Sequence, residues 1–200
     1  TDELIPSGET SSYRSNPVKL SEFALSRKDP QYVPRAKEVL AVERLRRTNP
    51  GDPRVGEALL GHDPADTGLG SLVMALKPGD GSAREQAASC QRVLGGCANL
   101  CYEFATKRYR SNCVNWGMLP FTLAEGANFP GHPGDFLYVP QVREKVTRSD
   151  EEFPALLLTD SGIHALTLYL KNTTAEEREL LLTGCLMNHY AAQNAAENRR

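Results

Sequence analysis

The chain has 200 residues and a formal net charge of −2 at pH 7. That length suits a single domain able to bury a core without disulfides or metal, and the balanced charge argues against nucleic acid or an anionic membrane as partner. No apolar run approaches the roughly 18 residues of a membrane span and no secretory leader is recognisable, so we expect a cytoplasmic protein with reduced thiols.

The first residues of the chain open in mid-pattern and without Met, which predicts a domain excised from a longer polypeptide. Residues 7–17 follow and are rich in Ser, Thr, Gly and Asn. A loop of this composition is either flexible or presents its hydroxyls and Arg14 to a ligand.

Two helices are expected after this loop. The first is short and covers residues 18–26, and the second covers residues 34–47, where Pro34 stands at the start and apolar residues recur at three- and four-residue steps. The basic end of the second helix, residues 44–47, is favoured by the helix dipole and predicts a solvated helix end rather than a nucleic-acid patch. Residues 48–70 are rich in Gly and Pro and predict a connection.

Residues 72–94 predict a strand, a glycine turn and a helix in succession. Ser82 and Glu85 have the spacing of a capping box, and the helix is expected to continue until two glycines end it. A unit of this kind directs free N–H groups and the positive end of the helix dipole to one point, and Arg84 adds a guanidinium that can bind a carboxylate or phosphate. The alternative is an ordinary capped helix with a surface arginine.

The second half of the chain predicts a mixture of strands and helices. A strand over 98–104 and a helix over 106–116 are followed by four more strands, over 118–123, 135–139, 155–159 and 164–171. Thr174 and Glu177 form a second capping box that opens a closing helix, with apolar residues at four-residue steps through Leu186. Residues 194–200 are polar and are expected to fray. The expected class is α/β, with a mixed sheet and helices around it.

The five cysteines lack the spacing of metal ligands. The cysteines are Cys90, Cys97, Cys101, Cys113 and Cys185. Six, three and eleven residues separate the first four cysteines in turn, and the four histidines are scattered along the chain. No pair has the CxxC spacing of many zinc and redox sites. We therefore expect buried thiols, and no metal or cofactor bound by this chain.

Three segments together resemble the C-terminal swivelling domain of the aconitase superfamily. They are Thr1-Asp2 with Leu4-Ile5-Pro6, Asp80 to Ala88 with Arg92 and Leu94-Gly95-Gly96, and Asn112 with Gly117-Met118-Leu119-Pro120. The family carries a Thr-Asp-His-Ile-Ser-Pro-like start, a Gly-Ser-Ser-Arg-Glu-His segment and an Asn…Gly-Leu-Leu-Pro segment in the same order. The resemblance covers roughly residues 1–125. It implies a swivelling β/β/α domain over residues 1–200, with a mixed sheet or barrel-like core flanked by helices.

The resemblance also implies roles for individual residues. Ser82 matches the base that removes a proton from the carbon next to a substrate carboxylate, and Asp2 matches an aspartate that orients a catalytic histidine of another domain. Arg14 and Arg84 match binders of substrate carboxylates. Ala83 replaces the family's second serine, so that only its backbone N–H can contribute. The structural alternatives are a helix cap for Ser82, a mobile loop residue for Arg14 and an exposed acid for Asp2.

Two further departures argue against a standard citrate-specific aconitase, since Glu3 and Gln86 stand where the family has histidines. The cysteines that hold the family's 4Fe-4S cluster lie in other domains. The resemblance therefore implies that N-terminal cluster-bearing domains, or a large subunit as in isopropylmalate isomerases, complete the enzyme.

The intact enzyme implied by the resemblance is a lyase that reversibly dehydrates a small hydroxy di- or tricarboxylate, and the chain alone is expected to be inactive. The alternative is a non-catalytic ligand- or RNA-binding module derived from an aconitase. The near-neutral charge argues against RNA, because phosphate binding depends on clustered cations.

Overall fold

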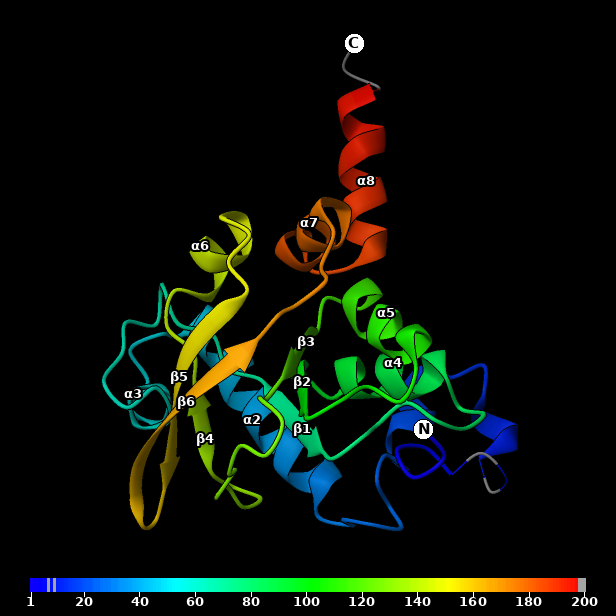
Figure 1. Cartoon of the computed structure of the whole chain (residues 1–200), viewed down its shortest axis with the longest axis horizontal. Helices are drawn as coiled ribbons and strands as arrows, with labels where there is room; N and C mark the ends of the chain where they lie inside the picture. The colour runs from blue at the N-terminus through cyan, green and yellow to red at the C-terminus, as the bar shows by residue number, and fades with distance from the viewer. Residues whose placement is uncertain (7, 9, 198–200) are drawn as a thin grey trace. The chain divides into compact units, whose positions relative to one another are not determined.

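The computed structural model describes residues 1–6, 8 and 10–197 (Figure 1). The chain divides into two compact units, Thr1–Val73 with Asp80–Ala98 and Met74–Gly79 with Asn99–Arg200. Within the described residues, no helix is long and apolar enough to cross a membrane.

The strands form one six-stranded sheet in the order β1-β2-β3-β6-β5-β4. The strands are β1 (Ser71–Ala75), β2 (Gly96–Cys101), β3 (Leu119–Thr122), β4 (Phe136–Tyr138), β5 (Glu152–Thr159) and β6 (Gly162–Tyr169). The pairs β3–β6, β6–β5 and β5–β4 are antiparallel, with Leu157 opposite His164 in the β5–β6 hairpin. The sheet is mixed and open, with β1 and β4 at its edges. This confirms the predicted α/β class, and the sheet is not closed into a barrel.

The first unit contains the polar loop and the helices of the N-terminal half. These helices are η1 (Ser11–Tyr13), α1 (Pro17–Ser21), α2 (Tyr32–Thr48), α3 (Pro53–Ala58) and α4 (Glu85–Val93). Helix α3 lies within the segment expected to be a connection. Its N-cap is Asp52, whose side chain accepts a hydrogen bond from the Arg54 N–H, and it buries Val55. The sequence pattern missed it because six residues are too few to establish a helical period.

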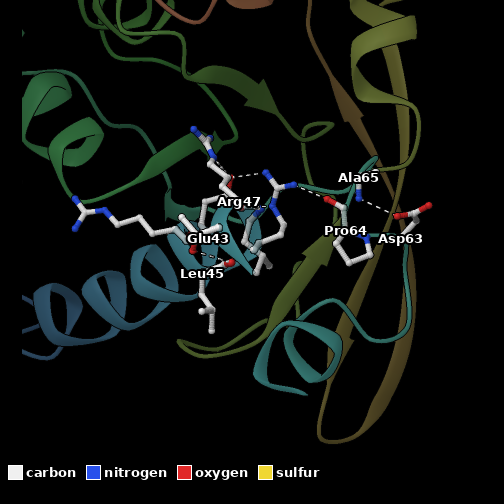
Figure 2. A network of polar contacts seen from close by, with 10 residues as sticks. Glu43, Leu45, Arg47, Asp63, Pro64 and Ala65 are labelled. Carbon is white, nitrogen blue, oxygen red and sulfur yellow. Dashed lines mark hydrogen bonds and ion pairs between the residues drawn. The ribbon is translucent and has the colours of Figure 1, made fainter. Parts of the chain in front are cut away.

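The basic end of α2 forms an ion-pair network (Figure 2). Arg46 and Arg47 both donate to the buried carboxylate of Glu43, which also accepts the N–H of Leu69. Arg46 donates in addition to the carbonyl of Pro64 and is only 15% exposed. The network attaches the connection before β1 to α2, so Arg46 is not part of the solvated surface that the sequence predicted.

The second unit contains the remaining helices, α5 (Lys107–Asn115), α6 (Val142–Thr147), α7 (Ala175–Thr183) and α8 (Leu186–Glu197). Helices α5 and α7 pack together, and so do α7 and α8 (Figure 1). The capping box that opens α7 is confirmed, because the Glu177 N–H donates to Thr174 Oγ1 and the Thr174 N–H donates to Glu177 Oε2, each at 3.1 Å.

The prediction of one continuous closing helix is wrong. Gly184 adopts the left-handed conformation, with φ +95°, and ends α7 before α8 begins. A glycine at this position is a common helix terminator because it has no Cβ to oppose positive φ. Helix α8 includes residues 194–197 of the segment expected to fray, and residues 198–200 lie outside the described part of the chain.

Candidate functional site

Asp2 and Ser82 meet at the turn between β1 and α4. The Ser82 hydroxyl donates to Asp2 Oδ1 at 2.8 Å, and the backbone N–H groups of Ser82 and Ala83 donate to the same oxygen at 3.0 and 3.2 Å. Asp2 and Ser82 are exposed, whereas Ala83 is buried. One carboxylate oxygen therefore takes a side-chain and two backbone donors from the segment that was predicted to bind an anion.

The start of the chain folds so that Asp2 reaches this turn. The Ile5 N–H donates to the Thr1 carbonyl at 2.9 Å, and the side chains of Leu4 and Ile5 are buried. The Thr1 nitrogen donates to the Asp80 carbonyl, and Thr1 Oγ1 accepts the Arg84 N–H at 3.3 Å. Burial of two apolar side chains anchors the segment, and the polar contacts of Thr1 set the position of its neighbour Asp2.

The capping box predicted for Ser82 and Glu85 is wrong. Helix α4 begins at Glu85, and its N-cap residue is Arg84, with no side-chain cap. The Ser82 hydroxyl is instead used by Asp2, an ionised acceptor that forms a stronger bond than a neutral N–H donor to a hydroxyl. Ser82 is thus not the helix cap that the structural alternative required.

Arg84 has an unusual backbone conformation, with φ +46° and ψ −114°. An L-residue with a Cβ rarely adopts this conformation, which costs about 1–3 kcal/mol and persists only where neighbouring contacts impose it. The bond from the Arg84 N–H to Thr1 Oγ1 is one such contact. Backbone strain of this kind is concentrated at functional sites, and it falls on a residue that the sequence had selected as a candidate.

The loop that carries Arg14 is ordered by local contacts over its described residues. Thr10 Oγ1 donates to the Pro6 carbonyl at 2.7 Å, and the ring of Tyr13 stacks on Phe23 with 5.5 Å between centroids. Arg14 is exposed, and its carbonyl accepts a hydrogen bond from Gln86 Nε2 at 3.3 Å. Residues 7 and 9 of the predicted loop lie outside the described part of the chain.

The structure therefore brings the main chain of Arg14 to the first turn of α4, while the meeting of the Arg14 and Arg84 guanidinium groups stays a prediction. Gln86 was not a candidate from the sequence. Its position, two residues after Arg84, was the available signal, but the partner of its amide depends on the path of a distant loop.

The hydrogen bond from the Ser82 hydroxyl lowers the pKa of Asp2 below its ordinary value of 3.8, and the N–H groups of Ser82 and Ala83 lower it further. Asp2 is consequently an anion at neutral pH. The N–H groups that the sequence assigned to a substrate anion, including that of Ala83, are bonded to this internal carboxylate. A substrate carboxylate can use them only if Asp2 moves.

The cysteines do not form a cluster site in the described residues. No group of three or more His, Cys, Asp and Glu side chains is placed there to hold a metal ion. Burial raises the pKa of Cys97 to about 11 and of Cys90, Cys101 and Cys113 to about 12. Thiols with such pKa values are protonated and weakly nucleophilic in the metal-free chain. Whether the chain binds a metal or cofactor stays a prediction.

No family model matches the chain, and no curated protein matches it either. Among solved structures, the chain is similar to 3-isopropylmalate dehydratase (leuD) from Methanocaldococcus jannaschii. The TM-score is 0.56 and the sequence identity 16%, and the match covers 99% of this chain and 89% of that chain. At this identity the likeness shows the fold alone, and it agrees with the fold class predicted from the sequence.

Proposed function

We propose that this chain is the swivel domain of an aconitase-like hydro-lyase that reversibly dehydrates a small hydroxy di- or tricarboxylate. The contact between Ser82 and Asp2 is the observation that carries the proposal. The likeness to a dehydratase structure supports the same kind of fold, and the three sequence segments that resemble aconitases suggest Ser82 as base and Arg84 and Arg14 as carboxylate binders.

Ser82 is the proposed base. A serine hydroxyl is a weak base in water, and it becomes effective only where neighbouring groups orient it and stabilise its deprotonated form. Asp2 Oδ1 accepts a hydrogen bond from the Ser82 hydroxyl, with 2.8 Å between the two oxygens, and this directs a lone pair of Ser82 Oγ away from Asp2. As that lone pair takes the substrate proton, the hydroxyl proton of Ser82 passes to Asp2 Oδ1. In this geometry Asp2 orients Ser82. The resemblance to aconitases instead implies that Asp2 orients a histidine of another domain.

Arg14 and Arg84 are the proposed carboxylate binders. A guanidinium pairs with a carboxylate through two parallel hydrogen bonds, and neutralising the carboxylate makes the proton on the adjacent carbon easier to remove. Both arginines are exposed on the unit that contains Ser82. The backbone N–H of Ala83 is proposed to bind a substrate carboxylate only in a state in which Asp2 has moved away from it.

The partner in this proposal is a cluster-bearing part of the enzyme, either N-terminal domains or a large subunit. The described residues contain no group of three or more His, Cys, Asp and Glu side chains placed to hold a metal ion, which supports the proposal that the Lewis acid for the departing hydroxyl comes from that partner. The chain alone is then expected to bind substrate weakly and not to turn it over.

The substitution Ser82→Ala in the intact enzyme tests the role of the base. We expect kcat to fall by about 10²–10⁴, with a much smaller change in KM, because a base acts in the transition state. Ser161→Ala, which removes an exposed hydroxyl in the β5–β6 turn, is the control and should keep wild-type kinetics. A folded Ser82→Ala enzyme with kcat within about tenfold of wild type would contradict the proposal.

The non-catalytic alternative predicts a different outcome. If the chain is a binding module, the wild-type protein with its partner shows no turnover of any hydroxy di- or tricarboxylate tested, and Ser82→Ala changes affinity alone.

A further inference from the structure

Gln86 contacts two parts of the candidate site at once. Its backbone N–H donates to the Ala83 carbonyl at 3.0 Å, in the turn that holds Asp2. Its side-chain Nε2 donates to the Arg14 carbonyl at 3.3 Å. The side chain is half-buried, and it stands in the first turn of α4, beside the strained N-cap residue Arg84.

Local contacts fix the shape of the described part of the Arg14 loop, since Thr10 bonds Pro6 and Tyr13 stacks on Phe23. Helix α1, which follows the loop, packs on α4. The Gln86 bond adds a direct link from α4 to the carbonyl of Arg14 itself, which lies next to the base of the Arg14 side chain.

We propose that Gln86 is a positioning residue, which holds Arg14 at the start of α4 so that Arg14 and Arg84 bind the same substrate. This inference rests on the proposed function. The backbone of Arg84 is held by Thr1 Oγ1, and that of Arg14 by Gln86 Nε2, so both side chains start from fixed points. Two guanidinium groups bind one polycarboxylate well only when their separation is fixed before binding.

The chemistry of residue 86 makes the proposal specific. The Arg14 carbonyl requires a donor, which the glutamine amide supplies. Methionine and glutamate have a similar length but no donor at neutral pH, whereas lysine keeps a donor on a flexible stem. Gln86→Met and Gln86→Glu therefore remove the bond with little change of volume, and Gln86→Lys is the rescue.

Limited proteolysis with an arginine-specific protease tests the loop without any activity assay. Loss of one hydrogen bond should increase the population of the open loop about fivefold in Gln86→Met and Gln86→Glu. The rate of cleavage at Arg14–Ser15 should rise by the same factor. Gln86→Lys should cleave at nearly the wild-type rate. The control is the Arg148–Ser149 bond, which has the same chemistry in an exposed turn of the second unit. Unchanged cleavage at Arg14–Ser15, or equal acceleration at both bonds, would overturn the proposal.

The kinetics of the intact enzyme test the consequence for substrate. We expect Gln86→Met to raise KM more than it lowers kcat, and to have no further effect on KM when Arg14 is already Ala. Independent, additive effects of Gln86→Met and Arg14→Ala would mean that Gln86 does not act through Arg14. If the wild-type enzyme shows no dehydratase activity, the proposed function fails, and the proteolysis result still decides whether Gln86 holds the loop.

Discussion

Gly81 lies directly against the carboxylate of Asp2. A Cβ built on Gly81 would be 2.7 Å from Asp2 Oδ2 and 2.9 Å from Asp2 Cγ, closer than van der Waals contact allows. Gly81 also has φ +107°, where side chains are disfavoured. The approach of Asp2 to Ser82 therefore depends on a glycine at position 81, for two separate reasons.

The substitution Gly81→Ala is expected to lower the unfolding free energy by about 1–3 kcal/mol and to displace Asp2 from Ser82. Gly134→Ala is a matched control, because Gly134 has the same φ of +107° but no atom within 4 Å of the position that a Cβ would take. Urea unfolding of both variants separates the cost of a side chain at positive φ from the cost of the close contact with Asp2. An equal loss in both would mean that Asp2 gives way without cost, contrary to the expected close packing.

The pKa of Asp2 should rise toward its ordinary value of 3.8 in Ser82→Ala, because the hydroxyl bond is the largest cause of its lowering. Carbon-13 NMR titration of the carboxyl groups measures this directly. Asp52, whose pKa is lowered by Arg54, should titrate as in the wild type. An Asp2 pKa that is the same in both proteins would show that the hydroxyl bond is absent in solution.

The same lowering has a defined effect on stability. The pKa of Asp2 is lower in the folded than in the unfolded chain, so its contribution is complete above the unfolded value and is lost as the pH falls through the folded one. We expect the wild type to lose this contribution below about pH 4, and Asp2→Asn to lack that part of the acid dependence. Urea unfolding at a series of pH values measures both curves, and two parallel curves would contradict the expectation.

At position 84, we expect the stability of the fold to favour glycine and the binding of a carboxylate to require arginine. Arg84→Gly removes the strain of positive φ, while Arg84→Ala retains it, and both remove the guanidinium. We expect the Gly variant to be more stable than the Ala variant by about 1 kcal/mol, and both to lose affinity for a tricarboxylate. Thermal unfolding and calorimetric titration measure the two quantities. A more stable Ala variant would contradict the strained conformation, and full affinity in both would contradict the role in binding.

The isolated chain is expected to bind no iron stoichiometrically after anaerobic incubation with iron and sulfide. The described residues contain no group of three or more His, Cys, Asp and Glu side chains placed to hold a metal ion. Iron analysis and the visible absorbance spectrum test this. A brown protein with about four irons per chain would show that the cluster belongs to this chain.

The spacing of a capping box occurs at two places in the sequence, and the structure forms the box at only one of them. Thr174 and Glu177 form the predicted capping box, because each needs only the other and the local helix geometry. Ser82 and Glu85 have the same spacing, but the Ser82 hydroxyl bonds Asp2, which is 80 positions away in the sequence. A local pattern predicts a local bond only when no stronger distant partner reaches the same atom.

The sequence by itself determined the α/β class and the strand–turn–helix unit that ends in α4, with Arg84 at its start. Alternation, glycine turns and short motifs are local properties, and they suffice for these conclusions. Asp2 and Ser82 became catalytic candidates through the resemblance of three sequence segments to aconitases. The tertiary structure alone decided that Asp2 fills the N–H site at Ser82, and that Gln86 bonds Arg14. These pairs join residues 80 and 72 positions apart, so they depend on the path of the whole chain between them, which no local pattern encodes.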